Sequence, residues 1–364
     1  MKKIISIVLG VASLAACTKT SVSYEQPGEI ALAPVTRANM TKAAVTGTTF
    51  PATNDMGVYA YYNASKPAAT PKDVFLDRLD LSKALYMNNV RFMKKGTTTW
   101  AGANDQGEAT PYYWPKTGSL VFAAYSPKGA NLAYDAASDK FSTQPNTNYV
   151  QETDLSKTVD LLWSPMTTAS HANGQVTMVF YHAMSWVTVK VKAANDESIN
   201  KFRVKSIALN NIINEGSFTT NGSHIDWTPS TADAKTLSVF SNANSNSEGH
   251  VVSNTVAAVL ENVENGTVVI PQTLDNDAKL TVVFSQLMPT GNWSADQTLP
   301  FVLNACTTGE PAAALDEWKN GTHYIYTLSF NIKGGEGPGE NNEILIAPSL
   351  EKWQDVTASG INAQ

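Results

Sequence analysis

The chain has 364 residues, of which 43% are hydrophobic and 16% charged, and its formal net charge is −6. This length suits two domains of ordinary size, each able to bury its own core. The acidic balance comes without a basic stripe, which argues against electrostatic docking onto nucleic acid or an anionic membrane surface. Short apolar runs rich in aromatic and β-branched residues alternate with turn residues, so we expect an all-β protein.

The N-terminus has the pattern of an export signal. Lys2 and Lys3 precede the apolar stretch IISIVLGVASLA, which is too short to span a bilayer, and small residues then lead to Cys17. The stretch LAAC resembles a bacterial lipobox, which implies a signal peptide over residues 1–16, cleavage after Ala16 and a lipid on Cys17. The alternative is an ordinary secretory signal in which Cys17 is incidental. In either case we expect the protein to leave the cytoplasm.

A first short strand follows a polar tether. The tether TKTSVSYEQPGE has no core pattern, and it leads into GEIALAPVTR, residues 28–37. We therefore group residues 17–37 as a tether and a first strand, in which Ile30 and Leu32 alternate with smaller residues.

Strand signals then come in quick succession. MGVYAYY at residues 56–62 alternates, SLVFAAYSP at residues 119–127 has the pattern of a buried strand that ends at a proline, and VDLLWSP at residues 159–165 ends in the same way. Residues 73–87 fit a short helix or an irregular segment. The polar stretch SPMTTASHANGQ, residues 164–175, predicts a domain boundary, with one β-sandwich over residues 38–168 and a second over residues 169–333.

The strand signal is strongest in the second part. Val187, Val189 and Val191 alternate with Thr188, Lys190 and Lys192, as expected of a strand with one face on a core and one face in water.

The C-terminal region combines a flexible spacer with a last strand. GGEGPGENN, residues 334–342, has its glycines in the wrong spacing for a phosphate loop, lacks a following lysine and is acidic, so we interpret it as a linker. Residues 343–364 follow and begin with EILIAPS, which shares Glu, Ile, Ala and Pro with EIALAPV at the same offsets. Chance similarity between β-rich segments is the alternative explanation.

The ordered set of local patterns resembles one family. NDMGVYAYY, TPYYWPKTGSLVFAAYSP, VDLLWSP, VTMVFYHAMSWVTVKV, VVIPQ and WKNGTHYIYTLSF, read behind a lipobox, are similar to the fimbrillins, the Mfa-like and FimA-like pilin lipoproteins of type V pili. The resemblance covers nearly the whole chain. It implies two transthyretin-like β-sandwich domains in tandem, a C-terminal donor-strand segment, and assembly by strand exchange between neighbouring subunits.

The resemblance also implies a processing scheme. An outer-membrane lipoprotein precursor is cut by an Arg-specific protease after its first strand, which here places the cut between Arg37 and Ala38, with Lys42 as an alternative basic target. The cut releases the removable strand that carries Ile30 and Leu32. The donor strand is then expected to act through a second set of residues, Ile344, Ile346 and Trp353.

The expected function is therefore that of a structural pilin subunit of a cell-surface fimbrium that supports adhesion or biofilm formation. Its expected partners are neighbouring pilin subunits, the outer membrane through the lipid before processing, and a host protein or glycan. Three alternatives stay open: a pilus anchor subunit that keeps its lipid, a non-polymerising glycan-binding lipoprotein, and a β-sandwich hydrolase.

Catalytic and metal-binding patterns are missing from the sequence. The histidines are scattered without HExxH or paired cysteines, no nucleophile elbow or Walker A sequence occurs, and we expect no cofactor, no metal and no enzyme activity. Cys306 lies in an apolar run, which favours a buried structural role. His182 lies in a strand, where a satisfied core histidine is expected. Tyr112, Tyr113, Trp114 and Trp100 fit core or subunit packing better than a carbohydrate platform.

Overall fold

The computed structural model describes residues 28–36, 50–64, 84–230, 234–242, 248–255, 258–259, 266–308, 313–332 and 342–352. Strands dominate these residues, and the helical elements with defined bounds are three-residue 3-10 turns: η1 (Lys128–Ala130), η2 (Leu155–Lys157), η3 (His171–Asn173), η4 (Asp196–Ser198) and η7 (Leu303–Ala305). The predicted all-β class is confirmed. Cys17, Arg37, Ala38, Lys42 and Trp353 lie outside the described residues.

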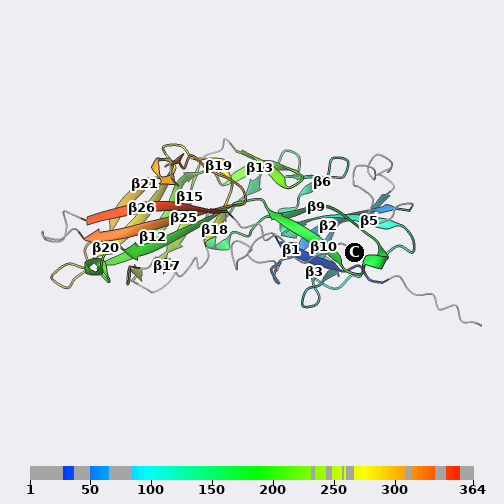
Figure 1. Cartoon of the computed structure of the whole chain (residues 1–364), viewed down its shortest axis with the longest axis horizontal. Coiled ribbons are helices and arrows are strands. Elements are labelled where there is room, and N and C mark those ends of the chain that lie inside the picture. Colours follow the sequence, from blue (N-terminus) through cyan, green and yellow to red (C-terminus); the bar gives the residue numbers. More distant parts are fainter. Residues whose placement is uncertain are drawn as a thin grey trace, which may run out of the picture.

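Seven strands of the N-terminal half close into a barrel (Figure 1). Around the barrel they are β1 (Leu32–Thr36), β10 (Val176–His182), β9 (Leu162–Ala169), β5 (Ser119–Ser126), β2 (Met56–Asn63), β3 (Leu85–Lys94) and β4 (Trp100–Ala103). Every residue of β5 is buried, as its apolar run predicts. β1 is the strand that closes the barrel, because it pairs with β10 on one side and with β4 on the other.

β9 differs from its predicted extent. The sequence indicates that this strand ends at Pro165, whereas it continues to Ala169. Its pairing with β5 shifts register between Phe122 and Ala124, next to the proline. A proline is tolerated at such an irregularity, since the backbone N–H that it lacks is not needed in the ladder there.

The predicted boundary at residues 168–169 does not coincide with a change of sheet. Residues 164–175 connect β9 to β10, and both strands belong to the barrel. The change of sheet comes later, between β10 and β11 (Ser185–Ala193), which are separated by two buried residues, Ala183 and Met184. The polar composition of 164–175 therefore marks a turn within one sheet.

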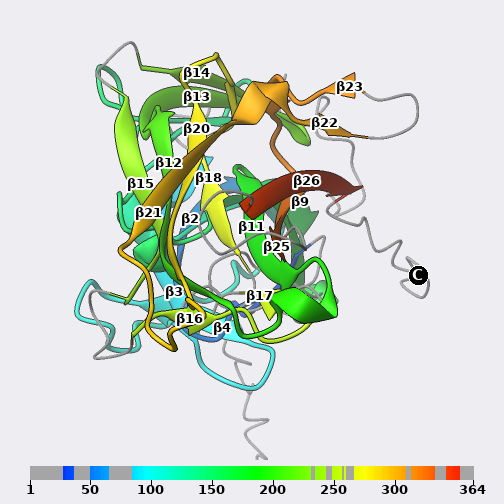
Figure 2. The same ribbon diagram turned by 90° about the vertical axis from the view of Figure 1, so that its left-hand side faces the viewer.

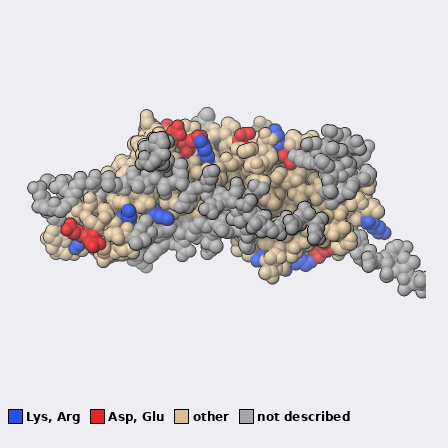
Figure 3. Space-filling model, viewed as in Figure 1, with Lys and Arg blue, Asp and Glu red and all other residues tan. Residues whose placement is uncertain are grey.

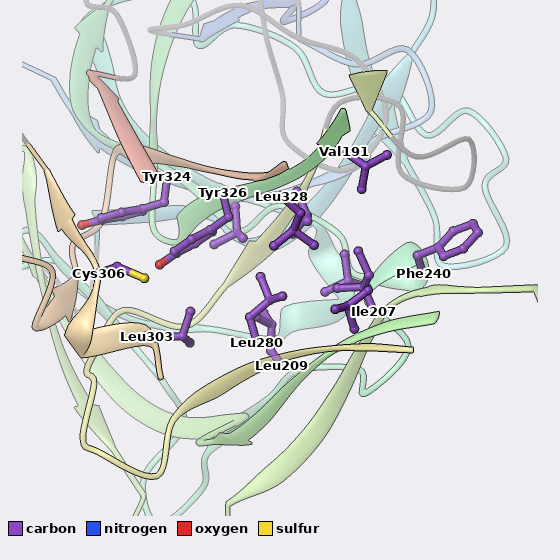
Figure 4. Close-up of a cluster of buried hydrophobic side chains, with 14 of the residues drawn as sticks. Val191, Ile207, Leu209, Phe240, Leu280, Leu303, Cys306, Tyr324, Tyr326 and Leu328 are labelled. Carbon is purple, nitrogen blue, oxygen red and sulfur yellow. The ribbon is translucent and has the colours of Figure 1, made fainter. Parts of the chain in front are cut away.

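The C-terminal half consists of two sheets that face each other across a core (Figure 2). One has the order β17 (Ala258–Val259), β11, β25 (Thr322–Ile332) and β26 (Asn342–Lys352), with β18 (Thr267–Val269) also on β11. The other has the order β15 (Lys235–Ser241), β12 (Phe202–Ile212), β20 (Lys279–Gln286) and β21 (Gln297–Val302), with β16 (His250–Val251) also on β12. Figure 4 shows Leu328 of the first sheet pointing toward Leu280 of the second, while the Tyr326 ring extends toward Cys306.

A further sheet joins the two halves. It combines β6 (Ala133–Asp135), β7 (Lys140–Ser142) and β8 (Tyr149–Val150) with β13 (Glu215–Asn221) and β14 (His224–Pro229). There are also two small ladders, β19 (Gln272–Thr273) with β24 (Glu317–Trp318) and β22 (Thr307–Thr308) with β23 (Ala313–Ala314). Beneath the joining sheet, a hydrophobic cluster takes residues from both halves, including Tyr59, Trp163, Trp186 and Phe218. The halves are therefore packed together through an apolar core.

The alternation predicted for β11 is present, with one exception. Val187, Val189 and Val191 are buried, whereas Lys190 and Lys192 are half-buried. Thr188 is buried although it lies on the polar face. Its hydroxyl lies 2.8 Å from Nε2 of His323, and the His323 ring stacks on Trp186 with centroids 3.2 Å apart.

The buried His323 makes stability depend on pH. Burial, with a smaller contribution from the charge of Lys190, lowers the pKa of His323 to about 3. Between this pKa and the ordinary value near 6.5, only the unfolded chain binds the proton, so stability falls as pH falls through that window. We expect urea denaturation to show a loss of up to about 1.4 kcal/mol per pH unit from this group. The His323→Gln variant should lose this pH-dependent part of the free energy of unfolding. The His224→Gln variant should keep it, because His224 is exposed.

Cys306 has the structural role expected from its apolar surroundings. It is buried in the core of the C-terminal half, beside Leu303, Tyr324 and Tyr326 (Figure 4). Burial raises the pKa of its thiol, which disfavours the reactive thiolate.

Candidate functional site

The first strand is the most unusual feature of the barrel, because a short N-terminal segment forms part of its interior. The buried residues Leu32, Pro34 and Thr36 alternate with half-buried Ala33 and Val35. Ile30, just before the strand, continues the alternation and is fully buried, as is Leu32. The sequence predicted this two-residue spacing, and it places both apolar side chains in the barrel core.

Backbone hydrogen bonds hold the first strand on both sides. Its five residues run parallel to β10, from Leu32 opposite Val176 to Thr36 opposite Phe180. On the other side, Leu32 faces Trp100 of β4. The preceding residues continue this second side, where the Ile30 N–H donates to the Tyr112 carbonyl at 2.7 Å.

The segment of residues 112–114 forms part of the second wall. Glu29 and Tyr113 form an antiparallel bridge, and the Trp114 N–H donates to the Gly28 carbonyl at 3.0 Å. The Tyr112 side chain lies close against β4 because Gly102 has no side chain, since a Cβ there would be 2.7 Å from Cδ2 of Tyr112. We call residues 100, 112–114 and 176–180, which pair with residues 28–36, the first-strand cradle.

Aromatic rings line the interior of the first-strand cradle. Trp100 and Trp114 are each 2% exposed, which assigns them to the core and not to a carbohydrate platform. Phe50 packs on Trp100 with centroids 5.5 Å apart and on Phe180 at 4.9 Å. Tyr113 alone of the four predicted platform residues is exposed. Ile30 and Leu32 belong to the same hydrophobic cluster as these buried rings, and we call the rings that surround the two side chains the aromatic pocket.

Polar side chains surround the point where the strand enters. Lys95, in the turn after β3, places its Nζ 2.5 Å from Oε2 of Glu29. The Gly28 N–H donates to Nε2 of His171 at 3.4 Å. The Gln175 side-chain amide donates to the Thr98 carbonyl at 3.2 Å and reaches the Leu32 carbonyl at 3.5 Å. Sequence reasoning missed these contacts, because they join residues far apart in the chain and no local pattern marks them.

The C-terminal strand β26 lies in the other half of the molecule (Figure 1). It pairs antiparallel with β25 over 11 residues, with Ile344 opposite Phe330 and Ile346 opposite Leu328. β26 is the terminal strand of its sheet, so it covers one edge of β25 and leaves its own other edge outside the sheet. Asn342, the last residue of the predicted linker, is the first residue of this strand.

The remaining candidate chemistry is structural. His182 is buried, with its Nδ1 2.6 Å from Oδ2 of Asp160, as expected for a satisfied core histidine. Among the described residues, no group of His, Cys, Asp and Glu side chains has an arrangement that holds a metal ion. The same residues contain no helix long and apolar enough to cross a membrane. Charged side chains are scattered over the face shown in Figure 3 and form no continuous basic area there.

Comparisons with known proteins point to one family. The model of the family described as fimbrillin-like matches residues 36–353. A fimbrial protein from Bacteroides vulgatus has 16% identity and a TM-score of 0.51, with 90% of this chain and 100% of that chain covered. A candidate cell adhesion protein from Bacteroides uniformis has 16% identity and a TM-score of 0.49, covering 90% and 99%. A fimbrilin from Porphyromonas gingivalis has 11% identity and a TM-score of 0.37, covering 91% and 98%. No curated protein matches the sequence.

Proposed function

Because the chain belongs to the fimbrillin-like family, we propose that it is a structural fimbrial subunit, exported as a lipoprotein and activated when its first strand is cut away. The cut falls between Arg37 and Ala38, one residue beyond Thr36, the last residue of β1. The mature chain then joins its neighbours by exchanging strands at the cell surface, where the fimbrium supports adhesion or biofilm formation. The observation that carries the proposal is the position of β1 inside the first-strand cradle.

The consequence of removing β1 follows from its contacts. The cradle loses backbone partners for β10 and for residues 112–114, and each unsatisfied buried group costs about 1–3 kcal/mol. The aromatic pocket around Trp100 and Trp114 also loses the side chains that fill it. An opened cradle is therefore a strong acceptor for another extended segment of alternating apolar residues.

The C-terminal segment of a neighbouring copy has the matching pattern. Ile344 and Ile346 occur at the offsets of Ile30 and Leu32, and the neighbour donates them after β26 separates from β25. That separation breaks pairing along one edge of β25 only, because β26 is the terminal strand of its sheet. Trp353 follows the donor run and anchors it in the acceptor.

A core substitution in β1 tests the proposal, because it should affect the uncut precursor and not the mature subunit. We expect Leu32→Ala to lower the free energy of unfolding of the uncut precursor by about 2–5 kcal/mol, because the Leu32 side chain is fully buried. The same substitution should leave fimbriae recovered from the cell surface unchanged, since their subunits no longer contain residue 32. Chemical denaturation of both forms measures the difference.

Leu209→Ala is the matched control for this experiment. Leu209 is equally buried but lies in the C-terminal core, so its replacement should destabilise the precursor and the surface form alike. Equal destabilisation of both forms by Leu32→Ala would mean that β1 is retained, which contradicts the proposal. It would then favour an anchor subunit that keeps its lipid and its first strand.

A further inference from the structure

We infer that Lys95 fixes the register and direction of the incoming strand by binding Glu343 of the neighbouring subunit in place of Glu29. This inference rests on the proposed strand exchange and specifies the contact that aligns it. Lys95 contacts Glu29 in the structure, with 2.5 Å between Nζ and Oε2. Removal of β1 takes Glu29 away and leaves Lys95 at the entrance of the first-strand cradle without that carboxylate.

The apolar pattern alone leaves the register open. A shift of one residue turns every buried side chain outward, so it is strongly excluded. A shift of two residues that brings Leu345 to the place of Glu29 keeps apolar side chains, Ile346 and Pro348, in the aromatic pocket, so a different signal is needed to exclude it, whereas the opposite shift places the polar Asn342 where Ile30 lies. In the donor sequence, such shifts place Asn341 or Leu345 opposite Lys95, and only the unshifted register brings Glu343 there.

The proline supports the same register and direction. Along β1, the Ile30 N–H points to the wall of residues 112–114, whereas the Ala31 carbonyl accepts from Val176 of β10. Every second residue of a strand points its backbone N–H to the same side, so Pro34, four residues after Ile30, has its N–H position on the side away from β10. On that side the pair with β4 is at Leu32, two residues before the proline. Pro348 occupies the same offset in the donor sequence. A donor inserted in the same direction as β1 therefore has its proline where no donor is needed.

The ion pair contributes mainly to specificity. The Lys95 and Glu29 side chains are 52% and 30% exposed, and pairs exposed to this degree contribute little to stability. A misplaced donor, however, loses the attraction to Lys95, which discriminates between registers of similar apolar fit. We therefore expect an effect on the rate and fidelity of assembly, with the fold unchanged.

A charge exchange tests the contact in the full chain. Lys95→Glu and Glu343→Lys should each slow the growth of SDS-resistant oligomers about two- to fivefold, and the double variant should recover the original rate. The differences should disappear at 1 M salt, where the screening length is about 3 Å. Glu29→Lys is the matched control, because residue 29 is absent from the assembling form and its replacement should leave the growth of cut subunits unchanged.

A disulfide cross-link tests the direction in which the donor strand inserts, independently of the charge variants. Lys95→Cys with Glu343→Cys should give disulfide-linked dimers on assembly, whereas Lys95→Cys with Ser349→Cys should not, since the two donor positions are about 20 Å apart in a strand. The opposite result would mean reversed insertion and would overturn the inference. Polymers that form normally in every charge variant, without recovery in the double variant, would also overturn it while leaving strand exchange intact. Polymerisation without residues 343–364 would instead contradict the proposed function itself.

Discussion

Arg37→Ala is expected to leave every copy of the chain with its first strand in place and to abolish fimbrial assembly. The cradle stays filled by β1, whose Ile30 and Leu32 are fully buried, and a neighbour's strand cannot enter an occupied site. Mass spectrometry of the surface protein should find Ala38 as the N-terminus in the wild type and no such species in the variant. Polyacrylamide electrophoresis without heating should show a ladder of oligomers only for the wild type.

Lys42→Ala is the matched control, since it removes the nearest other basic residue and should leave both the cut and the ladder unchanged.

The structure adds a requirement for the protease. Thr36, which precedes the expected cut, is 3% exposed and paired with Phe180 of β10. The end of β1 must therefore open locally before cleavage, and such openings are rare for well-paired strands. A mature chain that begins at a residue before Ile30 would contradict the proposed activation.

Deleting residues 343–364 is expected to give a secreted, folded monomer that forms no SDS-resistant oligomers. The deletion removes β26, which exposes one edge of β25, but the core between the facing sheets keeps Tyr326, Leu328 and their partners across the core. The truncated subunit still has a cradle. Mixed with the wild-type chain, it should therefore accept a donor strand and end the growing polymer, so that the ladder becomes shorter as its share increases.

This capping effect separates a lost donor from a lost fold. A truncated chain that fails to fold neither polymerises nor shortens wild-type polymers. A truncated chain that folds shortens wild-type polymers but does not polymerise by itself. Deletion of residues 357–364 alone is the matched control, because it keeps Ile344, Ile346 and Trp353 and should polymerise normally. A ladder formed by the longer deletion on its own would rule out the C-terminal segment as the donor.

The fold class and the alternation within strands were predictable, because they depend on local patterns. Val187, Val189 and Val191 are buried as their spacing predicts, and Ile30 and Leu32 point into a core. These features need only the period of a strand and the apolar character of its residues. The tandem arrangement of two sandwiches remains a prediction, while the observed halves share a sheet and an apolar cluster.

What the sequence could not supply was which strand pairs with which. β10 carries a clear strand pattern, yet nothing in VTMVFYH indicates that it lies beside β1, more than a hundred residues earlier. No local sequence pattern indicates the contact of Glu29 with Lys95, 66 residues apart, or the stacking of Trp186 on His323. Long-range pairing depends on the whole fold, so composition and periodicity do not specify it.

The short connection between β10 and β11 has a mechanical consequence. Residues 176–193 run as one nearly continuous extended stretch, interrupted only by Ala183 and Met184. Its first part is bonded along β1, the place of the proposed incoming strand, and its second part lies along β25, after which the chain continues into the proposed donor segment of residues 343–364. In a polymer joined in this way, a pull on the fibre passes from one subunit to the next largely through a single run of covalent backbone. The adjoining ladders are then loaded along their strands, so many hydrogen bonds resist the pulling force together. The fibre therefore withstands tension better than a row of subunits joined by flexible hinges.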